Sequence, residues 1–91
     1  MTDPAPIDAR GLLCPLPVLR LRKVLLAQPA GARVRLLATD AMAAVDVPHF
    51  CDTAGHRLVG QHDMGDGVTE FTVERGPSAP LAASGPTPED I

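Results

Sequence analysis

The segment best suited to chemistry begins at Cys14 and continues as Pro15-Leu16-Pro17. It opens an apolar helical run that ends near Ala27. A cysteine at the start of a helix lies near the positive end of the helix dipole, which favours the charged form of its sulfur. Proline is tolerated in the first turn because the N–H that it lacks would have no partner inside the helix. A helix that only needed a cap would normally begin with Ser, Thr, Asp or Asn. The motif therefore predicts a reactive sulfur at a rigid, exposed corner, with Cys14 as the N-cap.

Four basic residues lie close to Cys14 in the sequence: Arg10, Arg20, Arg22 and Lys23. They could be no more than the solvated face of a helix. They could also form a positive collar that lowers the pKa of the thiol and docks an acidic partner. Against this, Pro17 removes one N–H donor from the first turn. We expect the pKa of Cys14 to lie below the ~8.5 of a free cysteine without becoming strongly acidic.

The second cysteine, Cys51, falls on an apolar helical stripe with Val47 and Phe50. Packing in the core is its expected role. The open alternative is a resolving thiol for Cys14, which would require the two Cα atoms to lie within ~7 Å.

Four residues could in principle ligate a metal: His49, Cys51, His56 and His62. Their spacing matches no standard zinc pattern, so we predict neither a metal nor a cofactor. An acid–base pair of Asp40 and Asp46 is also disfavoured, because a helix N-cap role accounts for each carboxylate.

The composition restricts the classes of function. A chain of 91 residues predicts one domain, and its net charge of −3 with no basic run beyond Arg22-Lys23 argues against coating nucleic acid or a membrane surface. We find neither a secretory signal nor an apolar run approaching the ~20 residues of a membrane span. Two cysteines in such a chain favour a reducing, cytoplasmic setting.

The elements that must position Cys14 alternate between strand and helix patterns. Strand patterns occupy residues 7–10, 33–39, 57–61 and 68–74. Of these, Val34, Leu36 and Ala38 should share one face, and Phe71 and Val73 should point inward.

Two helices complete the pattern. The first follows Cys14, and the second is predicted to begin at Asp46 as its N-cap, with Pro48 in the first turn, and to stop at Gly55. Residues 40–45 are ambiguous. The order β-α-β-α-β-β predicts an α+β fold, a two-layer α/β sandwich with two helices on one face of a small mixed four-stranded sheet.

The end of the chain has a different composition. From Gly76 onward it is rich in Pro, Ala, Ser and Gly and lacks the apolar residues that would offset the entropy of ordering. We therefore predict a folded domain over residues 1–75 and a disordered tail over residues 76–91.

With Cys-Pro-x-Pro at the start of its first helix, the segment 9–18 resembles the TusA/SirA-type sulfur carriers. The likeness extends through residues 22–23, 38–40, 46–51 and 55–58, and covers roughly residues 7–75. The resemblance implies a two-layer α/β sandwich in which Cys14 carries sulfur as a persulfide. It further implies that Pro15 and Pro17 are the motif prolines, and that Asp46 and Pro48 belong to a second-helix motif.

The resemblance also implies partners: a cysteine desulfurase or rhodanese-type protein as sulfur donor, and a second protein as acceptor. Our leading hypothesis is therefore a cytoplasmic sulfur carrier acting through Cys14. Two alternatives stay open: a redox switch that uses Cys14 and Cys51, and a non-catalytic module whose basic residues dock a regulator.

Overall fold

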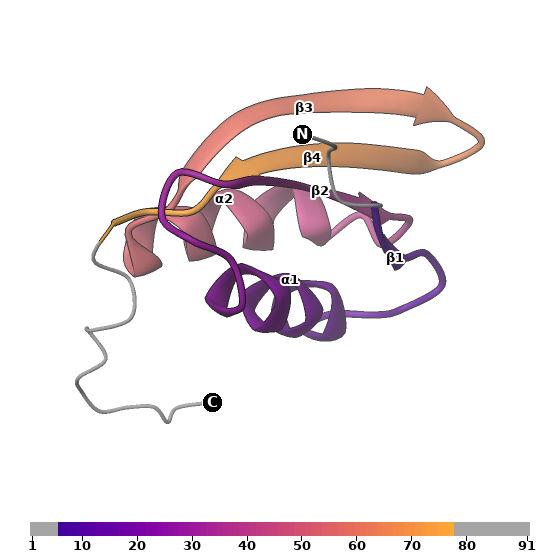
Figure 1. Cartoon of the computed structure of the whole chain (residues 1–91). Coiled ribbons are helices and arrows are strands. Elements are labelled where there is room, and N and C mark those ends of the chain that lie inside the picture. The colour runs from indigo at the N-terminus through magenta and orange to yellow at the C-terminus, as the bar shows by residue number, and fades with distance from the viewer. Residues whose placement is uncertain (1–5, 78–91) are drawn as a thin grey trace.

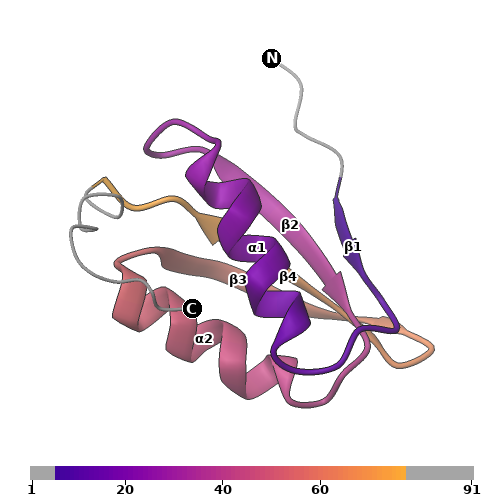
Figure 2. The same ribbon diagram turned by 90° about the horizontal axis from the view of Figure 1, so that it is seen from below.

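The computed structural model describes residues 6–77 as two helices packed on a four-stranded sheet (Figure 1). The elements along the chain are β1 (Ile7–Ala9), α1 (Leu16–Leu26), β2 (Arg33–Ala38), α2 (Ala43–Ala54), β3 (Arg57–Gly65) and β4 (Val68–Glu74). The strands lie in the order β1-β2-β4-β3, with β1 parallel to β2 and the other neighbours antiparallel. Both helices cover the same face of the sheet (Figure 2). The predicted α+β two-layer sandwich is confirmed.

The core between the two layers is aliphatic apart from Phe71 and Cys51. Its largest fully buried side chains are Phe71, Leu21, Leu25, Leu36, Val34, Val47 and Val73. Successive side chains of a strand point to opposite faces, and β2 accordingly buries every second residue. The predicted inward faces of β2 and β4 are confirmed. Each large aliphatic or aromatic side chain buried in this way contributes about 1.5–3 kcal/mol to folding.

The second helix begins earlier than predicted. α2 starts at Ala43, before the Asp46 that was expected to cap it. Asp40 supplies the preceding turn, because its backbone carbonyl accepts from the Ala43 N–H at 2.9 Å and its Oδ1 accepts from the Met42 N–H at 3.2 Å. Pro48 therefore lies inside the helix rather than in its first turn, which removes one helical hydrogen bond. The sequence was misleading here because two local signals both placed the helix start at residue 46. Asp is a favoured N-cap residue, and Pro is favoured in the first turn of a helix.

The predicted hairpin of the last two strands is confirmed, and its turn is tighter than expected. β3 continues to Gly65, and the turn consists of Asp66 and Gly67, which both have positive φ angles (55° and 78°). Asp-Gly is a favoured pair for such a turn because both central residues need positive φ. The strand was predicted too short because its second half, from Gln61, is exposed and carries no apolar alternation.

The chain beyond β4 is attached to α1 and to His56, which lies between α2 and β3. The buried Arg75 donates from Nε to the carbonyl of Leu25 at 2.9 Å, and the N–H of Gly76 donates to Nδ1 of the buried His56 at 3.0 Å. A Cβ at position 76 would overlap the carbonyl oxygen of Gly55. The structure thus places Gly76 inside the folded domain, although we assigned it to the tail. Residues 1–5 and the rest of the predicted tail, 78–91, lie outside the described residues.

Acid should weaken the fold through His56. Burial, with a further contribution from the charge of Arg75, lowers the pKa of His56 below the ordinary histidine value. Between this lowered value and the ~6.5 of the unfolded chain, the unfolded state binds more protons, so stability is lost as the pH falls through that window. His56→Asn keeps an acceptor oxygen but does not titrate. Its melting temperature should fall less than that of the wild type between about pH 7.5 and about pH 5.5.

The matched control for this experiment is His49→Asn, since His49 is exposed on the same helix that precedes His56. This variant should keep the pH dependence of the wild type. Equal slopes for the wild type and His56→Asn would contradict the role given to the His56–Gly76 hydrogen bond.

Candidate active site around Cys14

Cys14 is exposed in the loop that connects β1 to α1. The helix begins at Leu16 and its N-cap position is occupied by Pro15, so the predicted capping role of Cys14 was wrong by one residue. The N–H of Leu16 donates to the carbonyl of Leu13 at 2.8 Å, which closes a turn around Cys14 in front of the helix. The Cys14–Pro15 peptide bond is cis. Pro17 is buried in the first turn. The predicted exposure of the sulfur at the entrance of α1 is confirmed.

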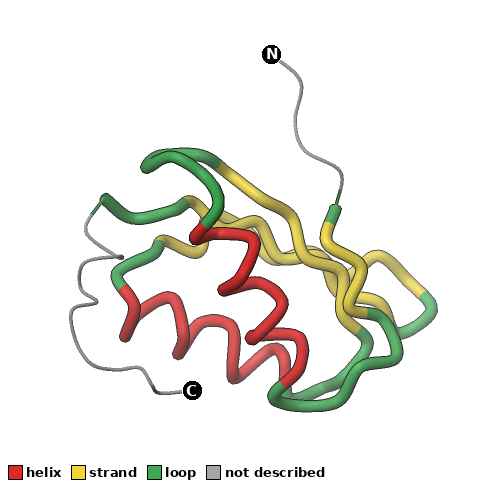
Figure 3. The backbone as a smooth tube through the Cα atoms, turned by 60° about the horizontal axis from the view of Figure 1, so that its bottom comes forward, coloured by secondary structure: helices red, strands yellow, loops and turns green. Residues whose placement is uncertain are grey.

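The residues that follow β2 fix the backbone of the Cys14 loop. Because β1 and β2 are parallel neighbours, their carboxyl ends meet at the same edge of the sheet, and the loops that follow them lie side by side (Figure 3). The N–H of Gly11 donates to Oγ1 of Thr39 at 2.9 Å, and the N–H of Cys14 donates to Oδ2 of Asp40 at 2.7 Å. Asp40 therefore holds both the cysteine loop and the turn that begins α2.

Asp46 contacts the sulfur itself. Its Oδ2 accepts a hydrogen bond from Sγ of Cys14 at 2.7 Å. Asp46 lies in the first turn of α2 and is half-buried, while the buried Ala43 and Val47 fix the helix against the core. Its predicted N-cap role was wrong. The sequence analysis considered Asp46 only as an N-cap or as a pair with Asp40, whereas in the structure it contacts the Cys14 sulfur.

The charges around the thiol oppose its ionisation. The pKa of Cys14 is raised above the ordinary cysteine value, first by the hydrogen bond to Asp46, then by desolvation, and then by the negative charges of Asp46 and Asp40. The prediction that this pKa would be lowered was therefore wrong. The physical reason for the difference is that the residues near Cys14 in the sequence are basic, whereas the charged groups near its sulfur in space are carboxylates.

The four basic residues do not surround the sulfur. Arg10 forms a two-point ion pair with Asp8, with Nε and Nη2 at 2.8 Å and 3.1 Å from the two carboxylate oxygens. This pair lowers the pKa of Asp8 to about 2. Arg22 is exposed on α1. The predicted docking role of these residues stays a prediction, but their predicted effect on the thiol is absent.

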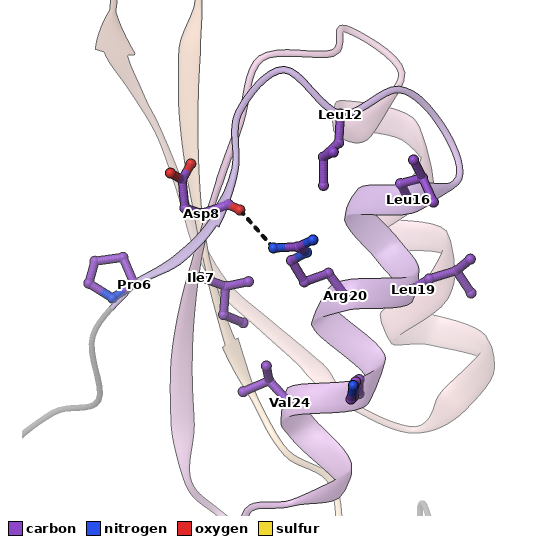
Figure 4. A pocket seen from close by; sticks show the side chains of 9 residues that line it. Pro6, Ile7, Asp8, Leu12, Leu16, Leu19, Arg20 and Val24 are labelled. Carbon is purple, nitrogen blue, oxygen red and sulfur yellow. Dashed lines mark hydrogen bonds between the residues drawn. The ribbon is translucent and has the colours of Figure 1, made fainter.

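Arg20 and Lys23 instead line an open groove between β1 and α1 (Figure 4). The groove has a volume of about 760 Å³, and Nη1 of Arg20 reaches across it to the carbonyl of Asp8 at 3.5 Å. Its apolar lining includes Leu12 and Leu16, which flank Cys14 in the chain. Leu16 is 48% exposed. The groove thus includes a residue on each side of Cys14 in the chain, and its α1 wall carries the positive charges of Arg20 and Lys23.

The second cysteine has a different environment. Cys51 is buried in the core and only 3% exposed, as predicted. Burial raises its pKa to about 11, so its thiol stays protonated and shielded. The one exposed and the one buried cysteine are both free thiols.

Over residues 6–77, no group of three or more His, Cys, Asp or Glu side chains is arranged to hold a metal ion. Of the three histidines, His56 is engaged with Gly76, and His49 and His62 are exposed on different elements. Neither helix in this described range is long and apolar enough to cross a bilayer.

The sequence analysis did not predict that Asp40 and Asp46 form hydrogen bonds with Cys14. No local pattern could reveal it, because Cys14 and Asp46 are 32 positions apart. The available signal was the order of the elements: a parallel β1–β2 pair brings the residues after each strand to one edge.

Comparison with known proteins gives a consistent result. The family model described as "Sulfurtransferase TusA" matches residues 5–75. The chain is 42% identical to the sulfur carrier protein TusA of Pseudomonas entomophila, over 69% of this chain and 82% of that protein. It is 34% identical to the putative sulfur carrier protein YrkI of Bacillus subtilis, over 77% of this chain and 92% of that protein.

A solved structure supports the same relationship. The crystal structure of a SirA-like protein from Desulfitobacterium hafniense superposes with a TM-score of 0.69 at 30% sequence identity, over 77% of this chain and 95% of that one. The family model, which matches residues 5–75, covers all the described residues except 76 and 77. The chain therefore belongs to the TusA sulfurtransferase family.

Proposed function

We propose that this protein is a cytoplasmic sulfur carrier that holds sulfur as a persulfide on Cys14 and relays it between two proteins. The observation that carries the proposal is the exposed Cys14 thiol, fixed by a hydrogen bond to its backbone and another to its sulfur. The names of the relatives, which are sulfur carrier proteins, agree with this chemistry. No cofactor is needed, because the sulfur is carried covalently.

Loading is a substitution at sulfur. The Cys14 sulfur attacks the terminal sulfur of a donor persulfide, a new S–S bond forms to Sγ, and the donor S–S bond breaks to release the donor thiolate. Unloading repeats the step with the acceptor thiol as nucleophile and Cys14 as leaving group. The donor would be a cysteine desulfurase or a rhodanese-like protein. Exposure of the sulfur matters because two partners must reach it in turn.

The redox-switch alternative is less consistent with the thiol environments. A resolving cysteine must reach the first sulfur, whereas Cys51 lies in the core with its thiol desolvated. The carrier proposal leaves Cys51 a packing role.

The first prediction from the carrier proposal is that only Cys14 accepts sulfur. Incubation with a cysteine desulfurase and radiolabelled cysteine should label the wild type and Cys51→Ala, and should not label Cys14→Ser. Cys51→Ala removes a buried sulfur and should lose about 1 kcal/mol of stability, which a melting curve checks. Labelling of Cys14→Ser to the level of the wild type would contradict the assignment.

The second prediction concerns docking. Arg20 and Lys23 line the groove that also includes Leu12 and Leu16, on either side of Cys14 in the chain, so an acidic partner surface would be attracted there. The double variant Arg20→Glu with Lys23→Glu should accept sulfur from the desulfurase several-fold more slowly. The wild-type rate should fall with added salt, because exposed charges are screened within about 10 Å at 0.1 M.

The matched control is Arg33→Glu, since Arg33 is exposed at the start of β2 and does not line the groove. It should load at the wild-type rate. A salt-independent wild-type rate, together with an unchanged rate for the double variant, would refute the docking role.

A further inference from the structure

Two carboxylates converge on the cysteine. Asp46 accepts from the sulfur at 2.7 Å, and Asp40 accepts from the backbone N–H of the same residue at 2.7 Å. Both belong to the segment that runs from the end of β2 into α2. Reactive cysteines are usually found beside Lys, Arg, protonated His or a metal, which stabilise the thiolate. This site has the opposite charge.

We propose that Asp46 is the proton partner of Cys14 in sulfur transfer, and that its negative charge biases the carrier towards releasing sulfur. The proposal rests on the sulfur-carrying function above and assigns to Asp46 a role within it. Asp46 touches the reacting atom, so it acts on the chemistry directly.

The empty carrier is the state that Asp46 stabilises. In that state the Cys14 S–H donates to Oδ2 of Asp46. Hydrogen bonds in which one partner is ionised are roughly twice as strong as neutral ones. The thiol is therefore held in its protonated form, which is the less nucleophilic one, until a donor persulfide is brought to it.

Loading moves the proton away from this bond. As Sγ attacks the terminal sulfur of the donor persulfide, its proton passes to Oδ2 of Asp46 and then to the departing donor thiolate. One S–S bond forms and one breaks. The transferred sulfur keeps its oxidation state, so no external oxidant or reductant is required.

The loaded carrier is the state that Asp46 destabilises. Sγ then carries sulfur instead of hydrogen and can no longer donate to Asp46. A persulfide is more acidic than its parent thiol, so its terminal sulfur is an anion at neutral pH. Because Asp46 contacts Sγ and Asp40 contacts the Cys14 N–H, this added negative charge is brought next to two carboxylates, and like charges repel each other. Transfer to the acceptor relieves the repulsion and restores the S–H···O hydrogen bond.

The test compares the wild type with Asp46→Asn in two measurements. The first is the pH dependence of Cys14 alkylation by iodoacetamide in the Cys51→Ala background. The second is the equilibrium between the protein and glutathione persulfide, with the loaded fraction read from the intact mass. Asp46→Ala provides a second variant, and melting curves show that each one is folded.

The proposal predicts that both Asp46 variants shift the alkylation midpoint to lower pH. It also predicts a larger ratio of loaded to empty protein at equilibrium. A shift of one pH unit in the midpoint corresponds to about a tenfold change in that equilibrium if the same interaction governs both. Asp52→Asn is the control, because Asp52 is exposed on the same helix and has no hydrogen bond to Cys14. It should behave as the wild type in both measurements.

The possible failures are distinct. If the wild type loads normally and both Asp46 variants have the same alkylation midpoint and the same loading equilibrium as the wild type, the role of Asp46 is overturned. The carrier function is then left intact. Wild-type protein that never gains sulfur would overturn the carrier function, and with it the bias towards release. An upward shift of the alkylation midpoint in folded Asp46→Asn would overturn the proton-partner role by itself.

Discussion

The parallel pairing of β1 with β2 is the constraint on which the site depends. It brings the ends of the two strands to one edge, so the segment that carries Cys14 lies against the segment that carries Asp40 and Asp46. The α1 crossover makes this pairing possible, because parallel neighbours cannot be joined by a tight turn. The buried Leu21 and Leu25 in turn hold α1 on the sheet. A small aliphatic core thus fixes the position of one exposed sulfur.

The structure separates the basic residues from the thiol. The cations Arg20 and Lys23 lie along the α1–β1 groove, and the carboxylates Asp40 and Asp46 lie at the sulfur. A positive groove can attract an acidic partner while the pKa of Cys14 stays raised, because that pKa is set by Asp46, desolvation and Asp40 and not by Arg20 or Lys23. A carrier gains from this arrangement, since a sulfur that is strongly stabilised by nearby cations would be slow to leave.

The sequence predicted the elements whose signals are periodic. Burial of Val34, Leu36 and Ala38 follows from the two-residue period of a strand, and that of Val47 and Cys51 from the helical period. It did not predict contacts between distant segments. The start of α2 at Ala43 depends on Asp40. The raised pKa of Cys14 depends on Asp46, whereas the basic residues near Cys14 in the sequence had predicted a lowered one. The carboxylates lie next to the sulfur only after the sheet has formed.

The central claim is that Cys14, and no other residue, carries a sulfur atom. Mass spectrometry of peptides from the protein isolated without reductant tests it most directly. The account predicts one additional sulfur atom on the peptide that contains Cys14, and an unmodified peptide around Cys51. Loss of two hydrogens through a bond between Cys14 and Cys51, or the additional sulfur on Cys51 instead, would contradict it.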